Sequence, residues 1–166
     1  MTSLRLLKNL KRELLQLHGA LCKKAEEFND VIKMGRTQLQ DAVPIRLGQE
    51  FRAYSVAIMR DIHRMEKAMG EMRTLNLGGT AVGTGLNADE AYLHRIVPIL
   101  SEVSDMDLAQ AYDLIDATQN LDVFVAVSGA VKACAVTLSK IANDLRLMSS
   151  GPRAGLAEIN LPAKQN

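Results

Sequence analysis

Apolar residues recur every three or four positions through much of the chain, which is the spacing of one face of an α-helix. A first such stretch predicts one long helix over residues 3–32, with charged residues on the opposite face, and a second predicts a helix over residues 45–75. The apolar positions are Leu7, Leu10, Leu14, Leu17, Leu21, Ala25, Phe28 and Ile32 in the first stretch and Phe51, Tyr54, Ile58, Ile62, Met65, Met69 and Met72 in the second.

A third stretch, residues 119–149, is apolar almost all round through its middle. The β-branched run over 123–127 also permits a buried strand, but the length of the pattern favours a helix. A helix without a polar face needs neighbours on every side. Three long helices from one chain do not supply enough of them, so we expect other subunits to cover this helix.

Three polar, glycine-bearing segments interrupt these helices, and we expect turns there. The first is "KMGRTQLQDAVP", in which Pro44 restricts Val43 to extended geometry and can begin the next helix. The second is "LNLGGTAVGTGLNADE", whose Asn87 or Asp89 can cap a helix containing Pro98. The third is the tail over residues 151–166, and a shorter segment of 105–120 precedes the third long helix.

Composition limits the class of protein. The chain has 166 residues, which fits one domain or one large piece of a bigger protein. A formal charge of +1 gives no basic surplus for nucleic acid, and no apolar run reaches the length of a membrane span. The N-terminus carries charges among its leucines, unlike a signal peptide. Cys22 and Cys134 stand apart, as reduced thiols do in a cytoplasmic protein.

The candidate chemistry is sparse. His18, His63 and His94 lie far apart and show no ligand spacing, so we expect no metal site. The Gly83–Gly85 pair has two readings: a connector that passes close to other backbone, which we favour, or an anion-binding nest of N–H groups.

Thr37 and Gln38 are hydrogen-bond donors without acid–base or nucleophilic chemistry of their own. They can bind a carboxylate or cap a helix, and residue types alone favour the cap. Arg36 can clamp a charge or complement a helix dipole. The residues thus predict a long-helix oligomer whose interruptions bind something small and anionic.

Three segments in order resemble the aspartase/fumarase superfamily of homotetrameric lyases. "KMGRTQLQDAVPIRLGQEF" resembles its second signature region, "GGTAVGTGLN" its glycine-rich connector, and "GPRAGLAEINLP" the segment before its third signature region. The resemblance leans towards the aspartate ammonia-lyase branch, because fumarases usually carry Thr-His where this chain has Thr37-Gln38 and a Thr where it has Val43.

The resemblance implies an all-α fold: a long up-and-down helical bundle, the central domain of the superfamily, that assembles into a tetrameric core. It implies reversible elimination of ammonia from L-aspartate to give fumarate, without a cofactor, and it assigns substrate binding to Thr37 and Gln38. We expect a partial bundle domain over residues 1–150 and a truncated connector over 151–166.

The superfamily's catalytic serine lies in a "GSSxMPxKxNP" loop, which this sequence lacks; Ser149-Ser150 are not that pair. Each active site of the superfamily takes one signature region from each of three subunits. We therefore expect no catalytic residue in this chain and no activity from it alone. The open alternatives are a fumarase fragment and a non-catalytic helical scaffold.

Overall fold

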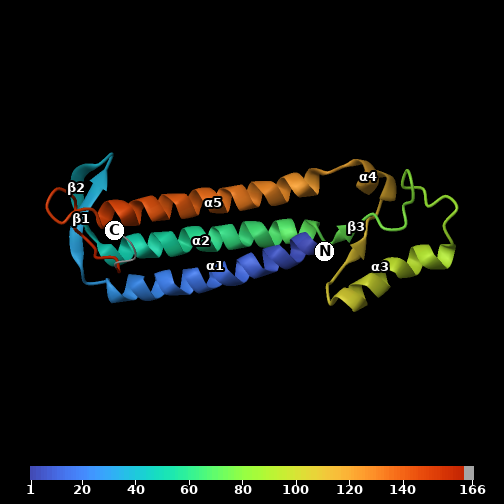
Figure 1. Cartoon of the computed structure of the whole chain (residues 1–166), viewed down its shortest axis with the longest axis horizontal. Coiled ribbons are helices and arrows are strands. Elements are labelled where there is room, and N and C mark those ends of the chain that lie inside the picture. The colour runs from blue at the N-terminus through green and yellow to red at the C-terminus, as the bar shows by residue number, and fades with distance from the viewer. Residues whose placement is uncertain (163–166) are drawn as a thin grey trace. The chain divides into compact units, whose positions relative to one another are not determined.

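The computed structural model describes residues 1–162 and contains three long helices, as the periodicity predicts (Figure 1). These are α1 (Thr2–Glu27), α2 (Leu47–Glu71) and α5 (Asp122–Met148). The strand alternative for residues 123–127 is wrong, because they lie in α5. The remaining elements are β1 (Ile32–Thr37), β2 (Gln40–Arg46), β3 (Thr74–Leu75), α3 (Glu90–Ser104), β4 (Ala109–Gln110) and α4 (Leu114–Gln119).

The chain divides into two compact units, one of residues 1–7 with 64–130 and the other of residues 8–63 with the chain from Val131 onward. Each of the three long helices contributes to both units. The division into a domain over 1–150 and a connector over 151–166 stays a prediction, and residues 163–166 lie outside the described part of the chain.

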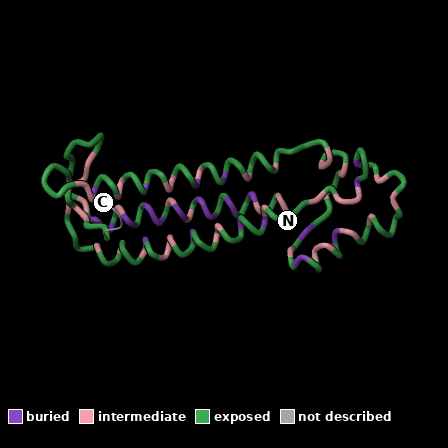
Figure 2. The backbone as a smooth tube through the Cα atoms, viewed as in Figure 1, coloured by how far each residue is buried: buried purple, intermediate pink, exposed green. Residues whose placement is uncertain are grey.

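In the second unit, the segments of α1, α2 and α5 run side by side and alternate in direction (Figure 1). The α2 segment carries the most buried positions, because the predicted stripe through Phe51, Ile58 and Ile62 faces the other helices (Figure 2). Gly48 explains how close α1 and α2 come: a Cβ there would lie 2.3 Å from the carbonyl oxygen of Ala25. Gly48 therefore permits the close approach of the two helices.

The first helix ends earlier than its apolar pattern. α1 stops at Glu27, and a turn leads into β1 at Ile32. Phe28 still packs in the core, with its ring centroid 5.3 Å from that of Phe51, but Ile32 is 75% exposed. The three-four spacing continued past the helix because the residues of the turn and the strand happened to fit it.

The first interruption is a β-hairpin, which the sequence analysis did not predict. β1 and β2 pair antiparallel, and the register shifts between Met34 and Arg36, which marks a β-bulge. Pro44 lies in β2 opposite Met34, so it does not begin the next helix; α2 begins at Leu47. Val43 is extended, as the residue before a proline should be.

The first unit has a small core of its own around Leu4, Val97 and Leu108. Asp89 caps α3 as expected, since its side chain accepts a hydrogen bond from the Tyr92 N–H. The glycine-rich segment is a close-packed connector: a Cβ on Gly83 would lie 2.4 Å from the backbone of Ile115. The connector reading of this segment is therefore confirmed, as is Pro98 inside α3.

The α5 helix is covered by its own chain along one stripe only (Figure 2). The buried stripe consists of Ala130, Cys134, Ile141 and Met148. Five large apolar side chains elsewhere on the helix are exposed: Phe124, Val125, Val131, Val136 and Leu147. Among the described residues, α5 is the one helix long and apolar enough to cross a membrane. The exclusion of such a span from length and composition is therefore wrong, although the core helix of a soluble assembly meets the same criteria.

Candidate functional site

The tip of the β1–β2 hairpin is a two-residue turn that strains the backbone. Thr37 pairs with Gln40, which leaves Gln38 and Leu39 as the turn. Both have positive φ, 52° and 63°, the combination for which hairpins favour Asn-Gly. Each non-glycine residue in this region costs on the order of 1 kcal/mol. Such strain concentrates at functional sites, so the turn marks this tip as a candidate site.

The predicted pair, Thr37 and Gln38, lies at this tip and is exposed. Neither caps a helix, so the capping reading is wrong: the start of α2 is instead bonded by Gln49, whose Oε1 accepts from the Arg46 N–H at 3.0 Å. Within residues 1–162, neither Thr37 nor Gln38 makes a side-chain hydrogen bond, which leaves both able to contact a ligand.

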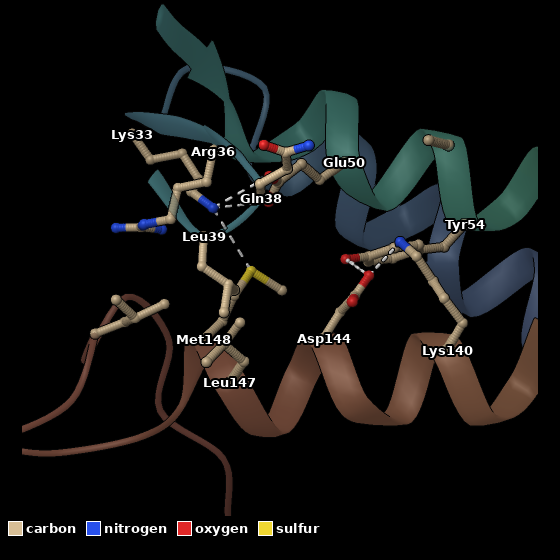
Figure 3. Close-up of a pocket in the computed structure, with 12 residues that line it drawn as sticks. Lys33, Arg36, Gln38, Leu39, Glu50, Tyr54, Lys140, Asp144, Leu147 and Met148 are labelled. Atoms are coloured by element: carbon tan, nitrogen blue, oxygen red, sulfur yellow. Dashed lines mark hydrogen bonds and ion pairs between the residues drawn. The ribbon is translucent and has the colours of Figure 1, made fainter. Parts of the chain in front are cut away.

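A cavity of about 410 Å³ lies beneath the tip, between the hairpin, α2 and α5 (Figure 3). Gln38 and Leu39 line it, whereas Thr37 does not. The structure therefore brings one member of the predicted pair to the cavity and leaves the other beside it. The remaining lining residues are Lys33, Arg36, Glu50, Ala53, Tyr54, Lys140, Asp144, Leu147, Met148 and Leu156.

An ion-pair cluster joins the hairpin to α2 and to the segment after α5. Lys33 Nζ lies 3.0 Å from Glu50 Oε2 and 2.8 Å from Glu158 Oε2. Arg36 Nη1 lies 2.6 Å from Glu158 Oε1. The cluster is largely buried: the side chains of Lys33 and Glu158 are only 9% and 13% exposed. These four residues form what we call the hairpin clamp.

The charges of the hairpin clamp stabilise one another. Burial alone would raise the pKa of Glu158, but its hydrogen bonds to Lys33 and Arg36 outweigh burial and lower the pKa. The hydrogen bond to Glu158 likewise raises the pKa of Arg36. Arg36 is therefore engaged within the fold. It neither complements a helix dipole nor stands ready to clamp a ligand.

A second polar group lies on the opposite wall of the cavity. The Tyr54 hydroxyl donates to Asp144 Oδ2 at 2.9 Å (Figure 3). Asp144 is also paired with Lys140, whose ammonium lies 4.9 Å from the centroid of the Tyr54 ring. Burial and this hydrogen bond raise the pKa of Tyr54. Tyr54 therefore stays protonated at neutral pH and serves as a donor, not as a base.

Most hydrogen-bond donors of the cavity are engaged within the fold: Lys33 and Arg36 with carboxylates, and Tyr54 with Asp144. Its two carboxylates, Glu50 and Asp144, are each paired with a lysine. Gln38 remains as a donor that can reach a ligand, whereas proton abstraction needs a group from elsewhere. Within residues 1–162, no three His, Cys, Asp or Glu residues lie close enough together to hold a metal ion.

His18 and Ser150 make contacts within the fold. His18 Nδ1 lies 3.0 Å from the Ser55 carbonyl oxygen, and its Nε2 lies 3.6 Å from Cys22 Sγ. This i, i+4 pair departs from the expectation that no histidine has a partner at ligand spacing, but it supplies only two of the ligands that a metal needs. Ser150 donates to the Leu147 carbonyl at 2.6 Å and accepts from the Leu156 N–H, which is a structural role.

Sequence reasoning missed most of the residues around the cavity. Lys33, Glu50 and Glu158 carry no local motif, and the two carboxylates belong to elements far from the lysine along the chain. A basic residue at each end of the "KMGR" segment was the available signal, and it does not say which carboxylates are the partners.

Comparison with known proteins gives a consistent result. The family described as Lyase matches residues 1–166. Aspartate ammonia-lyase of Bacillus subtilis (strain 168) is 54% identical over 164 residues, which are 99% of this chain and 34% of the relative. The chain thus spans about a third of the length of that relative.

Two crystal structures show the same fold. Fumarate lyase:delta crystallin from Brucella melitensis bound to cobalt has a TM-score of 0.93 at 49% identity, over 98% of this chain and 36% of that one. Recombinant class II fumarase from Schistosoma mansoni has a TM-score of 0.82 at 32% identity, over 93% of this chain and 36% of that one. Because the family match runs through the whole sequence, this chain belongs to the lyase family of the aspartase/fumarase superfamily.

Proposed function

We propose that this chain is the central helical region of an aspartate ammonia-lyase, which eliminates ammonia reversibly from L-aspartate to give fumarate. One observation carries the choice of substrate. The chain is 54% identical to the aspartate ammonia-lyase of Bacillus subtilis, against 32% to the class II fumarase. Fumarase, which eliminates water from L-malate, is therefore the weaker candidate.

In this proposal, Thr37 and Gln38 donate hydrogen bonds to a carboxylate of the substrate. Removal of the proton next to the β-carboxylate leaves extra negative charge on that group, and fixed donors stabilise it in the transition state. The exposed tip, its strained turn and its unengaged side chains support this role. The Gln38 amide donates at any pH, whereas a histidine there would titrate.

The remaining chemistry comes from outside these residues. The superfamily's serine motif does not occur in the sequence, and both carboxylates of the cavity are paired with lysines. We therefore propose that the 166 residues are inactive by themselves and contribute a substrate-binding region to a longer protein.

The exposed flank of α5 supports a homo-oligomer, which we propose to be a tetramer. Phe124, Val125 and Val136 are more than half exposed in the single chain, and burial of a large apolar side chain contributes about 1.5–3 kcal/mol. Copies of the same helix can cover these positions without leaving Lys132 and Lys140 in lipid. We propose a cytoplasmic rather than a membrane location, which also suits two cysteines that form no disulfide within the described residues.

The test is an assay of the full-length protein that contains this chain. Purified protein is mixed with L-aspartate or with L-malate, and fumarate is followed by its ultraviolet absorbance. We expect fumarate from L-aspartate and not from L-malate. Activity on L-malate alone would assign the protein to the fumarases, and a folded tetramer inactive on both would support the scaffold.

A further inference from the structure

We propose that Glu158 is a positioning residue for this site: through Lys33 and Arg36 it holds the hairpin so that its tip meets the substrate. The inference rests on the proposed function, and it adds a residue that does not itself contact the substrate. Its basis is the hairpin clamp, in which one carboxylate binds two basic residues of the strand that leads into the tip.

Glu158 is itself fixed from two directions. Its Oε1 faces Arg36 Nη1 and its Oε2 faces Lys33 Nζ. Its backbone N–H donates to the Met148 carbonyl at 2.8 Å, which ties it to the C-terminal end of α5. Glu158 has one oxygen hydrogen-bonded to Arg36, the other in an ion pair with Lys33, and its backbone N–H bonded to the end of α5. It can therefore act as an anchor for β1.

Lys33 extends the anchor to a second helix. Its ammonium also binds both oxygens of Glu50 in the first turn of α2, at 3.1 and 3.0 Å. Because Lys33 is buried between two carboxylates, removal of one of them leaves unbalanced charge rather than a simple gap. The loss of Glu158 should therefore move the hairpin, and a surface ion pair would not have this effect.

The position of Arg36 explains why the tip would respond. A strictly alternating strand points residues 33 and 36 to opposite faces. The register shifts between these two positions, where two residues of β2 stand opposite one of β1, and both basic groups reach the carboxylate of Glu158. Thr37 follows Arg36 directly, and the strained turn comes next. A strained tip keeps its geometry only when its surroundings hold it.

The experiment compares four variants of the full-length enzyme with wild type: Glu158→Gln, Thr37→Ala, the double variant, and Asp41→Asn as the matched control. Asp41 also faces Arg36, with its Oδ1 at 3.6 Å from Nε, but it is 74% exposed. We expect Glu158→Gln to lower kcat/KM for L-aspartate by about tenfold or more, as loss of positioning does. Asp41→Asn should stay within about twofold of wild type.

The double variant separates positioning from general damage. If Glu158 acts through the tip, the double variant should be no more than about twofold worse than the worse single variant. The proposal is overturned if the two losses multiply, or if Glu158→Gln stays within about twofold of wild type. An active wild type with an unaffected Glu158→Gln overturns this inference alone, whereas a wild type inactive on L-aspartate overturns the proposed function as well.

Glu158→Asp covers the case in which Glu158→Gln does not assemble. This variant keeps the charge but shortens the reach to Lys33 and Arg36. We therefore expect a tetramer whose kcat/KM lies between that of wild type and the tenfold loss expected for Glu158→Gln. Wild-type activity in Glu158→Asp, beside a Glu158→Gln that fails to assemble, would assign Glu158 to assembly alone and overturn the proposal.

Discussion

Arg36 and Glu158 form a 2.6 Å hydrogen bond across 122 positions of the chain. The first belongs to the strand that leads into the hairpin tip, and the second to the segment that follows α5. The geometry of the tip therefore depends on a distant part of the sequence as well as on its own turn. A reader of the hairpin sequence alone would not find this dependence.

The hairpin clamp should make the stability of the fold depend on pH. The folded-state pKa of Glu158 is lowered, so its contribution is fully present above its unfolded value of about 4.3 and is lost as the pH falls through the lower folded value. Thermal unfolding of the chain should show Glu158→Gln melting below wild type at pH 7. The difference should shrink below about pH 4.3; a difference that does not change with pH would contradict an ionic origin. Asp41→Asn serves as the exposed control.

Two glycines of α2 should respond to alanine in opposite ways. A Cβ at Gly48 would lie 2.3 Å from the Ala25 carbonyl oxygen, whereas a Cβ at Gly70 would meet nothing within 4 Å. We expect Gly48→Ala to reduce the free energy of unfolding by about 1–3 kcal/mol. Gly70→Ala should instead raise it by about 0.5–1 kcal/mol, because alanine favours the helix. Urea unfolding measures both, and equal effects would rule out the close helix contact.

The strain in the turn should be removable. Leu39→Gly places a glycine at a φ of 63°, which it adopts without penalty, so we expect the free energy of unfolding to rise by up to about 1 kcal/mol. Leu39→Ala is the matched control, because it removes the exposed leucine but keeps the Cβ. If both variants change stability equally in urea unfolding, the side chain rather than the backbone is responsible.

The exposed flank of α5 should cause association. Sedimentation velocity of the chain should show oligomers, and Val125→Lys with Val136→Lys should shift them towards monomer by placing charges in the interface. Gln16→Lys adds a charge at an exposed polar position of α1, outside this flank, and should leave the distribution unchanged. A well-folded wild-type monomer would contradict the interface. A chain that is obtained in soluble form only with detergent or lipid would favour a membrane location.

The long helices were predictable because their cores repeat locally. The buried stripe of α2 through Ile58, Ile62 and Met65 follows the three-four spacing throughout. Asp89, a residue type that favours the N-cap position, indicates the start of α3. The hairpin was not predictable in this way. Its strands show no clean alternation, and its Gln38-Leu39 turn lacks the Asn-Gly signal.

The candidate site was predictable only in part, for a related reason. Thr37 and Gln38 were found through a resemblance, and their chemistry alone favoured a helix cap that the structure does not contain. The partners of Lys33 come from α2 and from the segment after α5, so only the tertiary fold brings them together. Ion pairs between such distant segments leave no periodic trace in a sequence.

The measurement that tests this account most directly is the steady-state rate of fumarate formation from L-aspartate by full-length Thr37→Ala beside wild type. The account predicts a loss of kcat/KM of roughly 10²-fold, the scale for removing one donor to developing charge, in a variant that remains a folded tetramer. A Thr37→Ala enzyme with unchanged kcat and KM would show that the hairpin tip does not hold the substrate.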